Sequence, residues 1–180
     1  MALFAVKNIV SASQIDVAIR QLSTAIELYF SDGDIFSIYT LTRNAEEIIS
    51  VLLEKRGMQS LWRYVLEEKI SPEHRIEFQK IFDDPRNQLK HVRRGEDDIV
   101  ELPVRMVEVM MFVPVNALHM YWLNKFKENH NCVIYNIWGN VHESHLYENK
   151  LKLFSGDEKL SKREFYTKHK RQLEDLKHSN

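Results

Sequence analysis

"QIDVAIRQLSTAIELYF" (residues 14–30) carries the pattern that runs through most of this chain. Its apolar side chains recur every three or four residues, at Ile15, Ala18, Ile19, Leu22, Ile26 and Phe30. This spacing places them along one face of an α-helix. Ser11 or Ser13 can cap the amino end by accepting a hydrogen bond from a free backbone N–H group. The stretch therefore predicts an amphipathic helix that buries one face.

Helical spacing continues along the rest of the sequence. Further helices are expected over residues 34–56, 59–69, 72–83 and 103–128. Pro114 lies inside the last of these and should kink or split it, because proline lacks the N–H donor and crowds the preceding turn. The stretch "CVIYNIW" (132–138) is interpreted as helix or loop rather than strand. The five glycines fall between the periodic segments, and the whole pattern predicts an all-α, up-and-down helical bundle.

Length and composition are those of an ordinary globular protein. The 180 residues suffice for one domain with a continuous core, and 44% apolar with 28% charged residues argues against disorder. Cys132 is the single cysteine, which excludes an intramolecular disulfide and favours a reducing compartment. The start "MALFAVKNIV" lacks a signal-peptide cleavage site, and the most apolar run (109–123) is too short for a membrane span. We expect a cytoplasmic protein without a membrane segment.

The charge distribution limits the nucleic-acid partners. A net charge of −1 disfavours a general nucleic-acid binder, and DNA is not expected. Residues 159–180 differ from the rest, with seven Lys or Arg against three Asp or Glu. They predict a basic helix, interpreted first as a solvated face and second as a contact to phosphates. We expect a helical bundle over residues 1–130 and a carboxy-terminal extension over 131–180 that packs on the same domain.

The stretch "DDPRNQLKHVRRGEDD" (83–98) concentrates charged residues of both signs. Asp84 followed by Pro85 predicts the start of a helix, with a capping carboxylate and a proline that needs no N–H donor there. Gly95 predicts the end of the same helix. Pro85 and Leu89 share one face, which we expect to contact the core. The stretch is therefore interpreted as a short helix rather than a flexible connector.

The other faces of this helix are polar. Asn87 and His91 lie together opposite the core face, and Arg86, Lys90 and Arg94 form a basic flank beside them. Arg86 is expected in the first turn, where free N–H groups attract anions, so its guanidinium can bind a phosphate at two points. A nearby histidine titrates close to neutral pH and can move a proton. Arginine and histidine together are the minimum for RNA cleavage without metal, in which the ribose 2′-hydroxyl attacks its own phosphate.

The segment "RNQLKH" (86–91) resembles the signature of the HEPN superfamily of helical bundles: an arginine, a polar residue, three further residues and a histidine. Many members are metal-independent ribonucleases in toxin–antitoxin, phage-defence or RNA-processing systems. The resemblance implies that Arg86 binds phosphate and stabilises the transition state, that Asn87 assists, and that His91 is the acid or base. It also implies a homodimer in which two motif helices face each other, so that the partner chain supplies the second histidine.

A second segment, "LTRNAEEIISVLLEKRG" (41–57), resembles a helix of some uncharacterised bacterial proteins of this kind, and the likeness covers residues 14–128. Arg43, Glu46 and Glu47 are spaced to share a polar face. Adjacent glutamates diverge by about 100° on a helix, so at most one should face any site, and solvation or a salt bridge to Arg43 is the alternative role. The residues expected to contact the substrate are Arg43, Glu47, Lys90 and Arg94.

Two functional hypotheses follow. In the first, the protein is a metal-independent endoribonuclease of the toxin or defence type, which needs no cofactor and has an antitoxin as a candidate partner. In the second, the same HEPN-like fold is catalytically silent and binds a nucleotide or a protein partner. Acidic residues around the motif favour the second because they repel RNA; they are Asp83, Asp84, Glu96, Asp97, Asp98 and Glu101. A simpler interpretation makes Arg86 an ion-pair partner of nearby carboxylates and leaves His91 exposed.

Other residue sets predict less. His142 and His145 lie one turn apart as in a metal pair, but no third ligand has a suitable spacing, so no metal site is expected. Cys132 is interpreted as a buried, inert thiol because nothing near it in sequence would activate it. One apolar set is expected to form core or dimer packing: Met106, Met110, Met111, Phe112 and Trp122.

Overall fold

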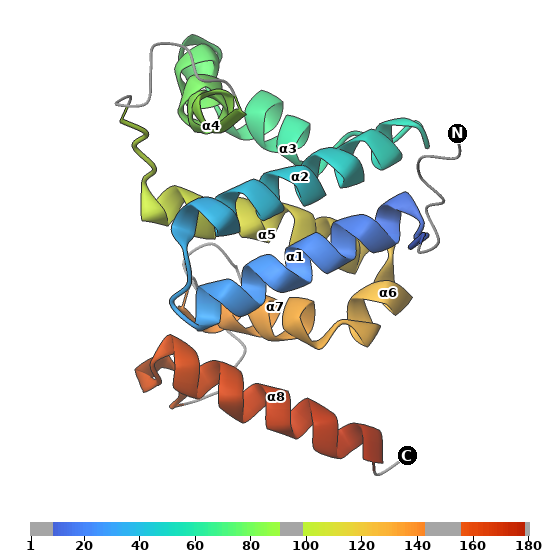
Figure 1. The fold of residues 1–180 in the computed structure, drawn as a ribbon. Helices are drawn as coiled ribbons and strands as arrows, with labels where there is room; N and C mark the ends of the chain where they lie inside the picture. The colour runs from blue at the N-terminus through green and yellow to red at the C-terminus, as the bar shows by residue number, and fades with distance from the viewer. Residues whose placement is uncertain (1–8, 91–98, 143–155, 179–180) are drawn as a thin grey trace, which may run out of the picture.

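The computed structural model describes residues 9–90, 99–142 and 156–178. These residues form eight α-helices and no strand, which confirms the predicted all-α bundle. The helices are α1 (Gln14–Phe30), α2 (Ile35–Glu54), α3 (Leu61–Tyr64), α4 (Arg75–Lys90), α5 (Val104–Tyr121), α6 (Leu123–Glu128), α7 (His130–His142) and α8 (Lys162–His178). Figure 1 shows α1, α2, α5 and α7 in the middle, with α4 on one side of them and α8 on the other.

The first two helices begin at capping side chains. Ser13, rather than Ser11, accepts a hydrogen bond from the N–H of Asp16 at 3.2 Å, and α1 has the predicted bounds. Asp34 caps α2 by accepting from the N–H of Ser37 at 2.8 Å. Helix α2 ends at Glu54, earlier than expected, and the chain then turns through Gly57 at a φ of +72°, a conformation that favours glycine.

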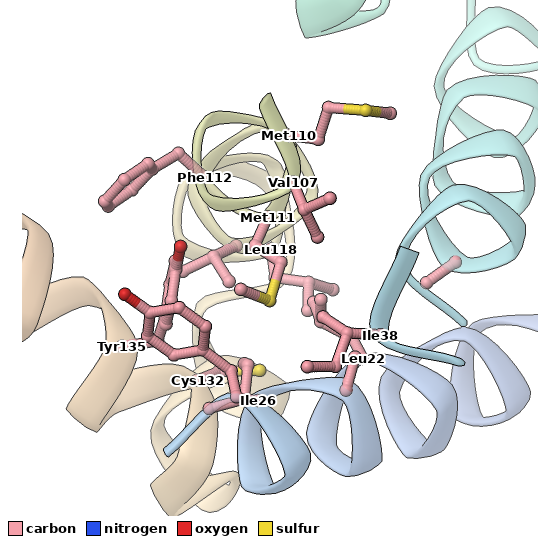
Figure 2. Close-up of a cluster of buried hydrophobic side chains, with 14 of the residues drawn as sticks. Leu22, Ile26, Ile38, Val107, Met110, Met111, Phe112, Leu118, Cys132 and Tyr135 are labelled. Carbon is pink, nitrogen blue, oxygen red and sulfur yellow. The ribbon is translucent and has the colours of Figure 1, made fainter. Parts of the chain in front are cut away.

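The core fills the space between α1, α2, α5 and α7. Figure 2 shows side chains from these four helices pointing toward one centre, among them Leu22, Ile26, Ile38, Met111, Leu118 and Tyr135. The expected methionine-rich set belongs to this core, because Met106, Met110, Met111 and Phe112 are all buried. Trp122 packs against its edge and is partly buried.

Helix α5 is not split at Pro114, one of the two outcomes expected there. The proline is buried inside a continuous helix that runs on to Tyr121. Loss of one backbone hydrogen bond is tolerated there because the residues around it pack in the core. The long apolar segment is instead divided at Trp122, whose φ of −137° ends α5 and lets α6 begin.

The start of α4 corrects the interpretation of residues 83–98. Asp84 and Pro85 do not begin a helix, because α4 begins at Arg75 and passes through Pro85. The physical reason is an uninterrupted apolar stripe: Phe78 and Phe82 pack on Trp62 with ring centroids 5.6 and 4.6 Å away, and buried Pro85 continues their face. A proline does begin the 3₁₀ turn Pro72–His74, which directly precedes α4.

Two further outcomes concern the same region. Leu89 is 38% exposed rather than buried in the core, one residue before α4 ends. Gly95, the expected helix end, lies outside the described residues. The segment expected to be helical over 59–69 consists of α3 followed by a π-helical turn, Val65–Lys69.

The carboxy-terminal elements pack on the central helices. The stretch 132–138 lies in α7, where Cys132, Tyr135 and Trp138 are buried. Helix α8 covers the predicted basic segment and contacts the bundle through Phe165, whose ring centroid lies 5.0 Å from that of Trp138. In the part of the chain that the structure describes, no helix combines the length and apolarity needed to cross a bilayer.

Candidate functional site

Charged side chains from α2 and α4 meet between the two helices. Arg43 of α2 binds Glu46 of the same helix at 2.8 Å and Asp83 of α4 at 3.1 Å. One turn further along α2, Glu47 accepts a hydrogen bond from Arg86 of α4. These two links join segments that are about 40 residues apart in sequence, and we call the five residues the α2–α4 charge cluster.

Arg43 and Glu46 form the buried floor of the cluster. They are 6% and 5% exposed. Glu46 also accepts a hydrogen bond from the hydroxyl of Ser50 at 2.6 Å. Burial raises the pKa of Glu46, while the Arg43 guanidinium acts in the opposite direction. The Nε of Arg43 is buried and has no acceptor among the described residues, which is unusual for a guanidinium held this firmly.

The spacing on α2 explains the cluster. Positions 43, 46, 47 and 50 are three or four residues apart and so lie on one face of the helix. The expectation that at most one of the two adjacent glutamates faces a site is wrong. Both line the same pocket, with Glu46 at its floor and Glu47, whose side chain is 50% exposed, at its rim. The alternative role, a salt bridge to Arg43, is confirmed for Glu46.

The pocket has a volume of about 430 Å³ and lies between α2, α4 and the segment of α3 with the following π-helical turn. Trp62 and Arg63 of α3 and Gln79 of α4 complete its wall. Arg63 lies 3.4 Å from Glu54 and 3.8 Å from Glu67, both of which also line the pocket. Among the described residues, the lining therefore holds the three guanidiniums of Arg43, Arg63 and Arg86 and the four carboxylates of Glu46, Glu47, Glu54 and Glu67.

Arg86 is at the mouth of this pocket, but not in the first turn of a helix. Because α4 begins at Arg75, Arg86 lies near its carboxy end, where the helix dipole no longer attracts an anion. Its side chain is 25% exposed and its partner is Glu47. The interpretation of Arg86 as an ion-pair partner is thus confirmed, although the carboxylate comes from α2 rather than from the acidic residues around the motif.

The remaining predicted site residues are only partly described. Asn87 follows Arg86 on α4 and is half-buried. Lys90 is the last residue of α4. The side chain of Lys90, together with His91 and Arg94, lies outside the described residues. The structure therefore brings Arg43, Glu47 and Arg86 together and leaves the position of the histidine as a prediction.

Several residues of the charge cluster and of the pocket were not anticipated from the sequence. Asp83 was counted only among the acidic residues that repel RNA, yet it pairs with Arg43. Its position three residues before Arg86 on one helix was an available signal. Trp62 and Arg63 reach the pocket from α3, and Glu54 reaches it from the last turn of α2. No local pattern could have indicated that these residues meet.

The other candidate sites can be placed as well. Cys132 is fully buried, as expected, and burial raises the pKa of its thiol to about 12, which disfavours the reactive thiolate. His142 stacks on Trp138 with ring centroids 3.6 Å apart, and His145 lies outside the described residues. In the described ranges no three His, Cys, Asp or Glu side chains are arranged to hold a metal ion.

Fold and site together define an all-α helical protein with a charge-paired pocket between α2 and α4. Comparison of the chain with protein-family models, with curated proteins and with solved structures finds no match.

Proposed function

We propose that the protein is a metal-independent endoribonuclease of HEPN type. The observation that carries the proposal is the position of Arg86. Its guanidinium lies at the mouth of a polar pocket, is fixed there by Glu47, and belongs to the same sequence segment as His91. An arginine held in one orientation by a carboxylate is prepared to bind a phosphate with its other N–H groups.

The chemistry assigned to these residues needs no metal. The ribose 2′-hydroxyl attacks its own phosphorus, the bond to the 5′-oxygen breaks, and a cyclic phosphate is left on the upstream product. Arg86 neutralises the charge that builds up on the phosphoryl oxygens. His91 takes or gives the proton, and Asn87 assists in orienting the phosphate. One chain offers one such histidine, so we propose that a homodimer supplies the acid and the base from its two chains.

A second candidate function is favoured by the carboxylates of the pocket. Four of them face a ligand that would itself be anionic, which weakens attraction for an RNA backbone. A catalytically silent HEPN-like module that binds a nucleotide or a protein partner fits this charge pattern. For the ribonuclease, we propose a toxin or defence role in the cytoplasm, with an antitoxin as partner.

Cleavage of RNA by three variants separates the two candidates. His91→Ala should abolish cleavage of single-stranded RNA while thermal stability stays close to wild type. Arg86→Ala should lose both rate and affinity, because it removes a charged donor with five N–H groups. Arg86→Lys should recover only part of the loss, since a point charge cannot bind phosphate at two places at once.

The nuclease assay also tests the chemistry. Wild-type cleavage should be unchanged by EDTA, and the upstream products should end in cyclic phosphates. A wild type that cleaves nothing, or a His91→Ala variant as active as wild type, would leave the binding module as the function. Strict dependence on magnesium or zinc would contradict the proposed mechanism.

A further inference from the structure

The wall of the pocket also contains an ion pair to which neither function assigns a role. Arg63 of α3 and Glu54 at the end of α2 are 3.4 Å apart. Their side chains are 54% and 42% exposed, so solvent screens the attraction between them and the ion pair is weak. The floor, in contrast, is formed by Arg43 and Glu46, which are buried and bound to each other. The pocket thus has a buried ion pair at its floor and a weak, solvent-exposed ion pair in its wall.

The spacing of Glu47 and Glu54 along α2 suits one nucleotide. Glu47, which holds Arg86, and Glu54, which holds Arg63, are seven residues apart on α2. At 1.5 Å per residue they are separated by about 10 Å along the helix axis. This is roughly the span from the phosphate of a nucleotide to the far edge of its base. A volume of about 430 Å³ is within the range of small-ligand sites.

The charges of this exposed ion pair restrict the ligand further. A ligand that takes Arg63 leaves Glu54 without its partner, whereas a ligand that takes only Glu54 leaves Arg63 with Glu67 at 3.8 Å. Polar groups that lose a partner on binding reduce affinity, so a ligand that binds Arg63 must also satisfy Glu54. It must present two adjacent acceptors to the guanidinium and two adjacent N–H donors to the carboxylate.

Guanine alone among the four RNA bases meets this requirement. Its O6 and N7 accept from an arginine at two points, which is a common way of reading guanine. Its N1–H and exocyclic amine donate side by side, as a carboxylate with two oxygens requires. Adenine and cytosine place a donor beside an acceptor on the corresponding edges, and uracil has a single N–H between two acceptors. Unstacked bases of single-stranded RNA are read on these edges.

We propose that the pocket binds a guanine nucleotide unit of RNA, with Arg63 and Glu54 on the base and Arg86 on a phosphate. The inference rests on the proposed function for its RNA substrate and assigns that substrate a preferred base. Arg63 and Glu54 determine specificity in this arrangement and take no part in proton transfer. Glu47 stays on Arg86, whose remaining N–H groups bind the phosphate.

The test compares the binding of mononucleotides to the full chain by calorimetry. GMP should bind about tenfold more tightly than AMP, CMP or UMP, as expected for a base read at paired donors and acceptors. Glu54→Gln should remove this preference, because an amide offers one acceptor where the carboxylate offers two. Glu68→Gln is the matched control, since Glu68 is an exposed neighbour that does not line the pocket. Equal binding of all four nucleotides, or a preference that survives in Glu54→Gln, would overturn the inference.

Binding of oligoribonucleotides tests whether the guanine that the pocket binds belongs to RNA or to a free nucleotide. Strands with one guanine should be bound in preference to strands without it, and an active enzyme should also cleave them in preference. The Glu54→Gln variant should bind both kinds of strand equally. Binding of GMP without any preference among oligonucleotides would contradict the RNA assignment. Because GMP binding is measured without cleavage, failure of the nuclease activity and failure of the guanine preference are separate results.

Discussion

Arg43 is the residue that connects the two halves of the candidate site. It is the most buried cation of the pocket, and it holds Glu46 below it and Asp83 beside it. Its guanidinium also lies 5.9 Å from the centroid of the Trp62 ring, close enough for a cation–π attraction. A buried charge of this kind is tolerated only while its partners remain in place. Arg43 is predicted to contact the substrate, and its ion pairs with Glu46 and Asp83 also link α2 to α4.

The first prediction at this scale concerns stability. Arg43→Met should lower the free energy of unfolding by about 3 to 5 kcal/mol, because it leaves the buried carboxylate of Glu46 without its cation. Urea denaturation followed by circular dichroism measures the change. Arg20→Met, at an exposed position of α1, should stay within about 0.5 kcal/mol of wild type. An Arg43→Met protein as stable as wild type would mean that the cluster does not hold the two helices together.

At the scale of helices, α1 and α4 show what a sequence can reveal. The bounds of α1 were predicted because the capping serine, the apolar stripe and the following turn all indicate the same helix ends. For α4 the local signals conflict: Asp84 and Pro85 suit a helix start, yet Phe78 and Phe82 continue the apolar face on which Trp62 packs. Tertiary packing overrides the local signal there. The pocket depends even more on distant contacts: Arg43, Glu46, Glu47 and Arg86 could be named from the sequence, whereas Glu54 of α2 and Arg63 of α3 could not.

The contact between α5 and α7 gives a second prediction. Gly139 of α7 lies so close to α5 that a β-carbon built on it would be 2.0 Å from Cε1 of Phe112. Gly139→Ala should therefore destabilise the protein by about 1 to 3 kcal/mol, despite the gain of about 1 kcal/mol that alanine brings to a helix. Gly57→Ala is the comparison, because it has a strained φ of +72° but no neighbour within 4 Å. A Gly139→Ala variant more stable than wild type would show that the two helices can separate freely.

The turn before α8 gives a third prediction, which concerns pH. Asp157 is buried and binds His169 at 2.9 Å as well as Lys168. Burial by itself would raise the pKa of Asp157, but the hydrogen bonds from Lys168 and His169 hold it below its ordinary value. A carboxylate with a lowered pKa in the folded state stabilises the fold above its unfolded pKa of about 3.9, and this contribution disappears as the pH falls through the folded value.

Asp157→Asn should therefore be less stable than wild type at pH 7, by about 3 kcal/mol for the loss of a buried charged partner. The difference should shrink as the pH falls below about 3.9, because wild type then loses the same charge. Urea denaturation at several pH values measures it. Asp32→Asn, at an exposed turn, should follow wild type throughout. A difference that is constant with pH would mean that the charge of Asp157 does not stabilise the start of α8.

At the scale of the whole molecule, the proposed catalytic histidine requires a second chain. The described residues of one chain supply guanidiniums and carboxylates to the pocket but no histidine. Cleavage by internal attack needs both a base for the 2′-hydroxyl and an acid for the leaving oxygen. If His91 provides one of these in each chain, a two-fold axis next to the end of α4 provides both.

The protein should therefore have a mass of twice 21.4 kDa in solution, measured by light scattering across a dilution series. Specific activity on RNA should fall as dilution separates the chains, because a lone chain lacks either the acid or the base. The fall in activity and the fall in mass should occur at the same concentration, since both report one association equilibrium. Full specific activity at concentrations where the mass is 21.4 kDa would exclude a composite site and require both proton transfers to be assigned within one chain.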